Sequence, residues 1–115
     1  MTTIYGISNC DTVKKALKFL DKHDIDYVFH DFRKDGIDQA LVTSFLTSVD
    51  WSELVNKRST TYRNLSDDEK NNLRAENVVG LLIEQPTLIK RPVLVKDNTT
   101  TVGYKEPTYA KVFSI

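Results

Sequence analysis

The chain has 115 residues, and its 16 Lys and Arg balance 16 Asp and Glu to a formal net charge of +0. This size predicts one domain over residues 1–115, and the balance argues against direct nucleic-acid binding through bulk positive charge. The single cysteine excludes an internal disulfide and suits a reducing, cytoplasmic compartment. We find neither a signal peptide nor an apolar run that would span a membrane. A single domain with a formal net charge of +0 fits a monomer.

The N-terminal third predicts a βαβ unit. Residues 3–7 are rich in strand formers, and the polar segment 8–11 then offers helix-capping side chains. Apolar residues follow at i, i+3, i+4 and i+7, which is the buried stripe of an amphipathic helix: Val13, Ala16, Leu17 and Leu20. Residues 25–32 alternate as a second strand, and a helix between two strands favours parallel pairing.

The middle of the chain predicts several short helices. One helix is expected to begin at Asp38, and a helical turn is expected at Trp51. Ser66 and Glu69 form a capping box, which predicts a third helix from about Asp67 to Arg74. Residues 77–84 predict a fourth helix, which stops before a proline.

The C-terminal part predicts a hairpin of residues 93–95 and 100–102, followed by a helix over residues 106–114. The element order is therefore β-α-β, a helical block, then β-β-α. This order predicts an α/β, thioredoxin-like fold: a mixed four-stranded sheet with a helical insertion at about residues 37–88.

Cys10 is the candidate nucleophile. It falls between the first strand and the first helix, where unpaired backbone N–H groups and the positive helix end favour a thiolate. Asn9 and the backbone N–H groups of residues 11–13 complete an anion-binding nest in this interpretation. The alternative is a buried cysteine that packs as a small apolar group, and its polar neighbours argue against this. We predict that Cys10 is at least partly reachable by solvent.

Two arginines are further candidates. Arg91 precedes Pro92 at the start of a strand, and we predict a cis peptide bond there, with the Arg91 guanidinium facing the cysteine loop. The alternative is a surface arginine that starts a strand. Arg58 lies in a segment rich in hydrogen-bond donors, although its spacing alone favours a solvated loop. The two histidines, His23 and His30, have no metal-ligand spacing, so we expect no metal site.

Four segments resemble one protein family in the same order: residues 3–17, 27–36, 56–63 and 89–92. They resemble the arsenate reductase-like (ArsC/Spx) family, and most of all its YffB branch of candidate glutathione-dependent thiol reductases. The resemblance implies a thioredoxin-like fold with an all-helical insertion. It also implies that Cys10 is catalytic, and it matches two family arginines to Arg58 and Arg91.

The chain departs from the family at two positions. The third arginine of arsenate reductases is absent from residues 102–107, where Lys105 is the nearest cation but lacks a planar, bidentate fork. This departure puts arsenate as a substrate in doubt. The second cysteine of the Cys-x-x-Cys switch found in many transcription regulators of the family is replaced by Val13, which argues against that branch.

The sequence therefore predicts a cytosolic thiol-dependent oxidoreductase. Because Cys10 has no second cysteine to resolve a covalent intermediate, an outside thiol must release it, and glutathione is the expected co-substrate. No bound cofactor or metal is expected; glutaredoxin is a further expected partner, and the substrate is a small oxidised molecule or oxyanion. The residues expected to bind it are Asn9, Asp11, Thr12, Pro92 and Lys105.

Two alternatives remain open. The first is a non-enzymatic binding module or Spx-like regulator that contacts RNA polymerase or another stress-response partner, with an exposed Trp51 or Tyr62 in the insertion as part of its surface. The second is a true arsenate reductase.

Overall fold

The computed structural model describes residues 2–115 and divides the chain into two compact units. The first unit contains the chain up to Asp35 together with Arg91–Ile115, and the second contains Gly36–Lys90. The second unit covers nearly the same residues as the insertion predicted at 37–88. That the whole chain forms one domain stays a prediction.

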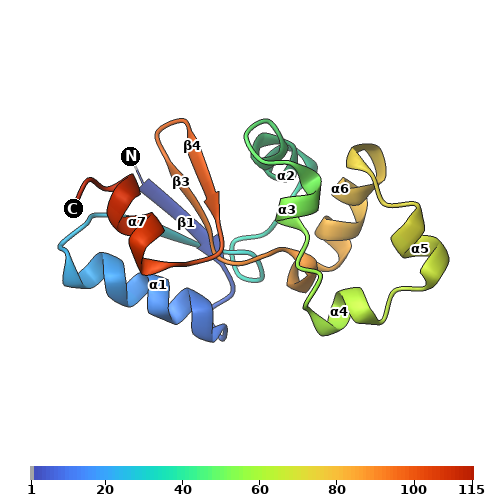
Figure 1. Ribbon diagram of the computed structural model, residues 1–115, viewed down its shortest axis with the longest axis horizontal. Helices are drawn as coiled ribbons and strands as arrows, with labels where there is room; N and C mark the ends of the chain where they lie inside the picture. The colour runs from blue at the N-terminus through green and yellow to red at the C-terminus, as the bar shows by residue number, and fades with distance from the viewer. Residues whose placement is uncertain (1) are drawn as a thin grey trace. The chain divides into compact units, whose positions relative to one another are not determined.

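The first unit is built on a four-stranded sheet in the order β2-β1-β3-β4 (Figure 1). The strands are β1 (Thr2–Gly6), β2 (Val28–Asp31), β3 (Val93–Lys96) and β4 (Thr99–Val102). Strand β1 pairs in parallel with β2 and antiparallel with β3, and β3 and β4 form a hairpin. This confirms the predicted mixed sheet, with its βαβ and ββα halves.

Helices α1 (Asp11–Lys22) and α7 (Glu106–Val112) pack against this sheet. The buried members of their shared core come from both helices and from two strands: Ile4, Ala16, Phe19, Leu20, Leu94 and Tyr109. The predicted stripe on α1 explains this packing, because Val13, Ala16 and Leu20 are fully buried. Burial of each large apolar side chain contributes about 1.5–3 kcal/mol, so α1 is held against the sheet mainly by this face.

Strand β2 is shorter than the predicted 25–32. Its ladder with β1 starts at the pair Thr3↔Val28, so the residues before Val28 have no described partner in β1. Asp24 adopts a left-handed φ of 55° at the end of α1, and Ile25 N–H donates to Leu20 O at 3.0 Å. These contacts hold residues 25–27 in a connection instead of a strand. The last helix also ends early, at Val112 instead of 114.

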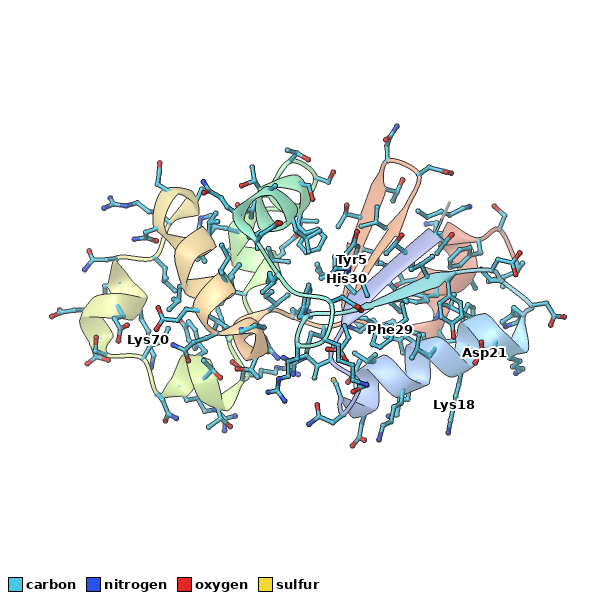
Figure 2. The ribbon with its side chains drawn as sticks, turned by 180° about the vertical axis from the view of Figure 1, so that it is seen from behind. Tyr5, Lys18, Asp21, Phe29, His30 and Lys70 are labelled. Carbon is cyan, nitrogen blue, oxygen red and sulfur yellow. The ribbon has the colours of Figure 1, made fainter. Side chains whose placement is uncertain are left out.

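The second unit is helical, as predicted. Its elements are α2 (Gln39–Leu46), α3 (Trp51–Leu54), α4 (Thr60–Arg63), α5 (Asp67–Asn71), α6 (Ala75–Glu84) and the 3₁₀ turn η1 (Pro86–Leu88). Helix α2 begins one residue after the predicted Asp38, because Asp38 is its N-cap and accepts from Leu41 N–H at 2.8 Å. Trp51 and Tyr62 are both half-buried, so neither is the exposed aromatic that the sequence interpretation considered. The Nζ of Lys70, which is labelled in Figure 2, lies 5.4 Å from the Tyr62 ring centroid.

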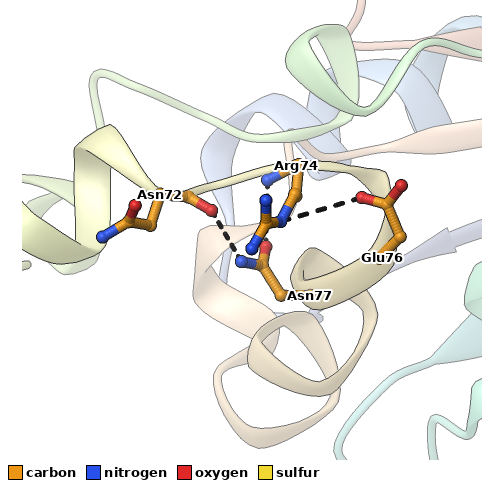
Figure 3. A network of polar contacts seen from close by, with 4 residues as sticks. All are labelled: Asn72, Arg74, Glu76 and Asn77. Carbon is orange, nitrogen blue, oxygen red and sulfur yellow. Dashed lines mark hydrogen bonds and ion pairs between the residues drawn. The ribbon is translucent and has the colours of Figure 1, made fainter.

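The boundary between α5 and α6 differs from the prediction because asparagine side chains replace helical backbone bonds there (Figure 3). Helix α5 ends at Asn71, three residues before the predicted Arg74. Asn77 accepts from Arg74 N–H at 2.9 Å and donates to Asn72 O at 2.6 Å, so α6 begins at Ala75, before the predicted residue 77. The short helix α4 was not predicted.

Candidate functional site

Cys10 is the N-cap of α1 and is half-buried, directly after the turn that follows β1. Its N–H donates to Ile7 O at 3.2 Å, and its carbonyl accepts from Lys14 N–H at 3.0 Å. The predicted position of the thiol at the helix N-terminus, within partial reach of solvent, is confirmed.

The environment of Cys10 lowers the pKa of its thiol. Burial raises the pKa, but the neighbouring polar groups outweigh that effect. The groups that lower the pKa are the backbone of Val13, the side chain of Arg91 with its positive charge, and the backbone of Thr12. All of these interactions favour the anion, so the thiolate, which is the nucleophilic form, is the form that this site stabilises.

Arg91 reaches the thiol from the start of β3. The Arg91–Pro92 peptide bond is cis, as predicted, and the hydrogen bond from the Arg91 side chain to Cys10 confirms that the guanidinium faces the cysteine loop. Pro92 is buried, and its carbonyl accepts from Gly103 N–H at 2.8 Å. The two catalytic candidates of the first unit therefore come together from segments about eighty positions apart in the chain.

Asp31 supports the cysteine loop, and sequence reasoning missed it. Asp31 is only 3% exposed, and its carboxylate accepts from Ser8 N–H at 3.3 Å, Arg33 N–H at 2.8 Å and Lys34 N–H at 3.3 Å. Burial raises the pKa of this carboxyl, but the hydrogen bonds outweigh burial and hold it below its usual range. A signal was present in the sequence, since Asp31 stands next to the end of the predicted strand 25–32, just before a turn.

Gly6 is a second residue that sequence reasoning missed. A Cβ atom at this position would lie 2.7 Å from Val13 Cγ2, so a side chain there would push the first turn of α1 away from β1. Because the backbone of Val13 is one of the groups that lower the pKa of Cys10, this close approach helps to set the surroundings of the thiol.

The remaining predicted site residues have different settings. Asn9, Asp11 and Thr12 are exposed around the helix N-terminus, and Lys105 is exposed at the N-cap of α7. Arg58 is exposed in the second unit, where its backbone N–H donates to Asn56 Oδ1 at 3.1 Å. The structure brings Arg91 to Cys10; roles for Arg58 and Lys105 stay predictions.

Within residues 2–115, no three His, Cys, Asp or Glu side chains lie together as a metal ion would require. In the same part of the chain, no helix has the length and apolar character to cross a membrane.

The fold and the thiol site together define a thioredoxin-like protein with one cysteine at the start of its first helix. The family model of the ArsC family matches residues 5–112, and the chain belongs to this family.

The chain is similar over nearly its whole length to solved structures and to a curated protein. A structure of a protein called YffB matches with a TM-score of 0.90 and 38% identity, covering 96% of this chain and 97% of that chain. The solution structure of an arsenate reductase (ArsC) related protein from Brucella melitensis matches with a TM-score of 0.81 and 44% identity, covering 99% and 95%. The global transcriptional regulator Spx of Staphylococcus epidermidis is 28% identical over 108 residues, which are 92% of this chain and 82% of the regulator.

Proposed function

We propose that the protein is a thiol-dependent oxidoreductase in which the Cys10 thiolate forms a covalent intermediate that glutathione releases. The observation that carries this proposal is the position of Cys10 as the N-cap of α1, where two backbone N–H groups and the Arg91 side chain lower the pKa of its thiol. Such donors are a recognised way to activate a cysteine nucleophile. Arg91 also has the planar donor fork needed to bind a carboxylate of glutathione or an oxyanion.

The proposed reaction is a pair of thiol–disulfide exchanges. The Cys10 thiolate attacks one sulfur of a substrate disulfide, forms a mixed disulfide and expels the other substrate sulfur as a thiolate. A glutathione thiolate then attacks the substrate sulfur of the mixed disulfide, and Cys10 leaves as a thiolate. The product is a disulfide between glutathione and the substrate, which a second glutathione reduces in solution to give glutathione disulfide.

The same interactions assist both exchanges. The backbone groups of Val13 and Thr12 and the Arg91 side chain lower the pKa of Cys10 and so favour its ionised form before attack. A lower pKa also makes Cys10 a better leaving group when glutathione attacks the mixed disulfide. Glutathione is required in this proposal because the chain has one cysteine and cannot resolve the intermediate by itself.

The test is the initial rate of glutathione-dependent reduction of 2-hydroxyethyl disulfide, coupled to NADPH oxidation by glutathione reductase. We expect turnover by the unmodified protein and none above background by Cys10→Ser, since a serine hydroxyl is scarcely ionised near neutral pH. Equal rates for the two proteins would overturn the proposal.

The family also makes arsenate a substrate to test. Arsenate must leave water for a site with paired cations. The third arginine of arsenate reductases is absent here, and loss of one charge-assisted partner weakens binding by about 10- to 150-fold. We therefore expect weak or no arsenate reduction in an assay coupled through glutathione and glutaredoxin. Robust reduction of arsenate by the unmodified protein would instead identify it as an arsenate reductase.

The relative named as a transcriptional regulator favours a second candidate, a non-enzymatic binding module. In that case Cys10 is idle or acts as a sensor. Alkylation measured against pH separates the two: an ordinary Cys10 pKa together with no turnover of either substrate would favour the binding module.

A further inference from the structure

A surface groove runs beside α1 in the first unit, and neither Cys10 nor Arg91 is among its lining residues. It has a volume of about 320 Å³ and lies between the exposed side of α1 and the start of α7. Its lining combines three lysines, two aromatic rings and one carboxylate: Lys15, Lys18, Lys22, Phe19, Tyr104 and Glu106. Figure 2 shows Lys18 projecting outward from α1.

The spacing of the lysines along α1 puts them on one side of the helix. Lys15 and Lys18 are three residues apart and Lys18 and Lys22 are four apart, and side chains at such spacings are neighbours on a helix surface. All three lysines are exposed, whereas Phe19 is only 5% exposed and Tyr104 is half-buried. The groove therefore has an aromatic floor and a row of cations along one edge.

Within residues 2–115, none of these three lysines forms an ion pair with a carboxylate. Asp21, on the same helix, accepts a hydrogen bond from Tyr27 OH at 3.0 Å. Glu106 lines the opposite edge, where its charge raises the pKa of Tyr104 after the larger effect of burial. The lining keeps an excess of two positive charges, which is complementary to an acidic ligand.

We propose that this groove binds an acidic segment of a disulfide-bearing protein substrate, which it positions for exchange at Cys10. The proposal rests on the proposed function, because it names the substrate class for the same thiol. The chemistry at the sulfur is unchanged: the substrate disulfide is attacked by the Cys10 thiolate, and glutathione supplies the electrons.

The dimensions of α1 fit such a substrate. Cys10 is at the N-cap, and Lys15 lies five residues further on, about 7.5 Å along the helix axis. From Lys15 to Lys22 the distance along the axis is about 10 Å, which an extended peptide spans in three residues. A segment with carboxylates within a few residues of its disulfide can therefore contact both the lysines and the thiol. An apolar side chain of that segment would pack on Phe19 and Tyr104.

The experiment compares two peptide substrates. Each peptide carries one cysteine as a mixed disulfide with glutathione, followed by four glutamates in one peptide and four glutamines in the other. The readout is the ratio of their kcat/KM values, measured with the unmodified protein. Each exposed ion pair contributes little alone, and three together predict about a 10-fold preference for the acidic peptide. The preference is expected to fall toward one when added salt shortens the screening length.

The variant Lys15→Gln/Lys18→Gln/Lys22→Gln is expected to reduce this ratio to near one. The matched control is Lys111→Gln, which removes an exposed lysine of the first unit outside the groove and is expected to keep the ratio. A ratio near one for the unmodified protein at low salt would overturn the groove proposal, as would an undiminished ratio in the triple variant.

A second measurement keeps the two proposals separable. A fluorescent glutamate peptide without a disulfide is titrated with the unmodified protein and with the triple variant, and its anisotropy is followed. We expect binding to the unmodified protein to be about 10-fold tighter. Equal affinities would overturn the groove proposal. If the unmodified protein binds the peptide but does not reduce 2-hydroxyethyl disulfide, the result would instead contradict the proposed function.

Discussion

The substitution Arg91→Gln tests the physical basis of the thiolate. Arg91 donates a hydrogen bond to the Cys10 sulfur and also stabilises it by charge, whereas the backbone donors Val13 and Thr12 remain in the variant. A hydrogen bond to a charged group contributes about 1.5–3 kcal/mol, and the partial exposure of Cys10 favours the lower end. The thiolate population at a pH below the midpoint is then expected to fall about tenfold.

The assay is the rate of alkylation by iodoacetamide, followed across pH by mass spectrometry. In the unmodified protein the rate rises through a midpoint below the ordinary thiol value, because the folded site stabilises the anion. In Arg91→Gln the midpoint moves to higher pH. The matched control is Arg33→Gln, an exposed arginine in the turn after β2, whose midpoint is expected to stay in place. An unchanged midpoint in Arg91→Gln would refute the assigned role of the guanidinium.

Three substitutions test the support around the site, with urea unfolding as the measurement. Gly6→Ala places a Cβ 2.7 Å from Val13 Cγ2 and is expected to cost about 1–3 kcal/mol, partly restored by adding Val13→Ala. Asp31→Asn is expected to cost about 1–3 kcal/mol at neutral pH. The pKa of Asp31 is lower in the folded state, so its ionised carboxylate contributes fully to stability above the ordinary pKa of 3.8. This contribution is lost as the pH falls through the folded-state pKa. A destabilisation by Asp31→Asn that is as large in acid as at neutral pH would contradict this. The buried Tyr109 hydroxyl has no hydrogen-bond partner within residues 2–115, so Tyr109→Phe is expected to be neutral or to stabilise by about 1 kcal/mol, and a loss of stability would count against that assignment.

The features that depend on local chemistry were predictable from the sequence. The polar segment before α1 placed Cys10 at the N-terminus of the first helix, and Arg91–Pro92 predicted a cis bond at the start of a strand. The apolar stripe on α1 predicted Val13, Ala16 and Leu20 as buried, because amphipathic periodicity determines which face of a helix packs, whereas it missed the buried Phe19 and included the half-buried Leu17.

The features that depend on long-range contacts were not predictable in the same way. Asp31 meets Ser8 across 23 positions in the chain, and Gly6 is required by contact with Val13 on another element. Neither contact leaves a periodic pattern in the sequence. Helix α4 was missed because four residues are too short for helical periodicity; the Ser59 hydroxyl, which accepts from Tyr62 N–H at 3.1 Å, was its only local signal.

The most direct test of the central claim is the intact mass of the protein after exposure to glutathione disulfide. The account predicts that one glutathionyl group attaches to the unmodified protein near neutral pH, that it maps to Cys10, and that excess glutathione then restores the original mass. Arg91→Gln should form the adduct more slowly, and Cys10→Ser should form none. An adduct that persists under excess glutathione, or one that forms as fast in Arg91→Gln as in the unmodified protein, would contradict a catalytic thiolate at Cys10.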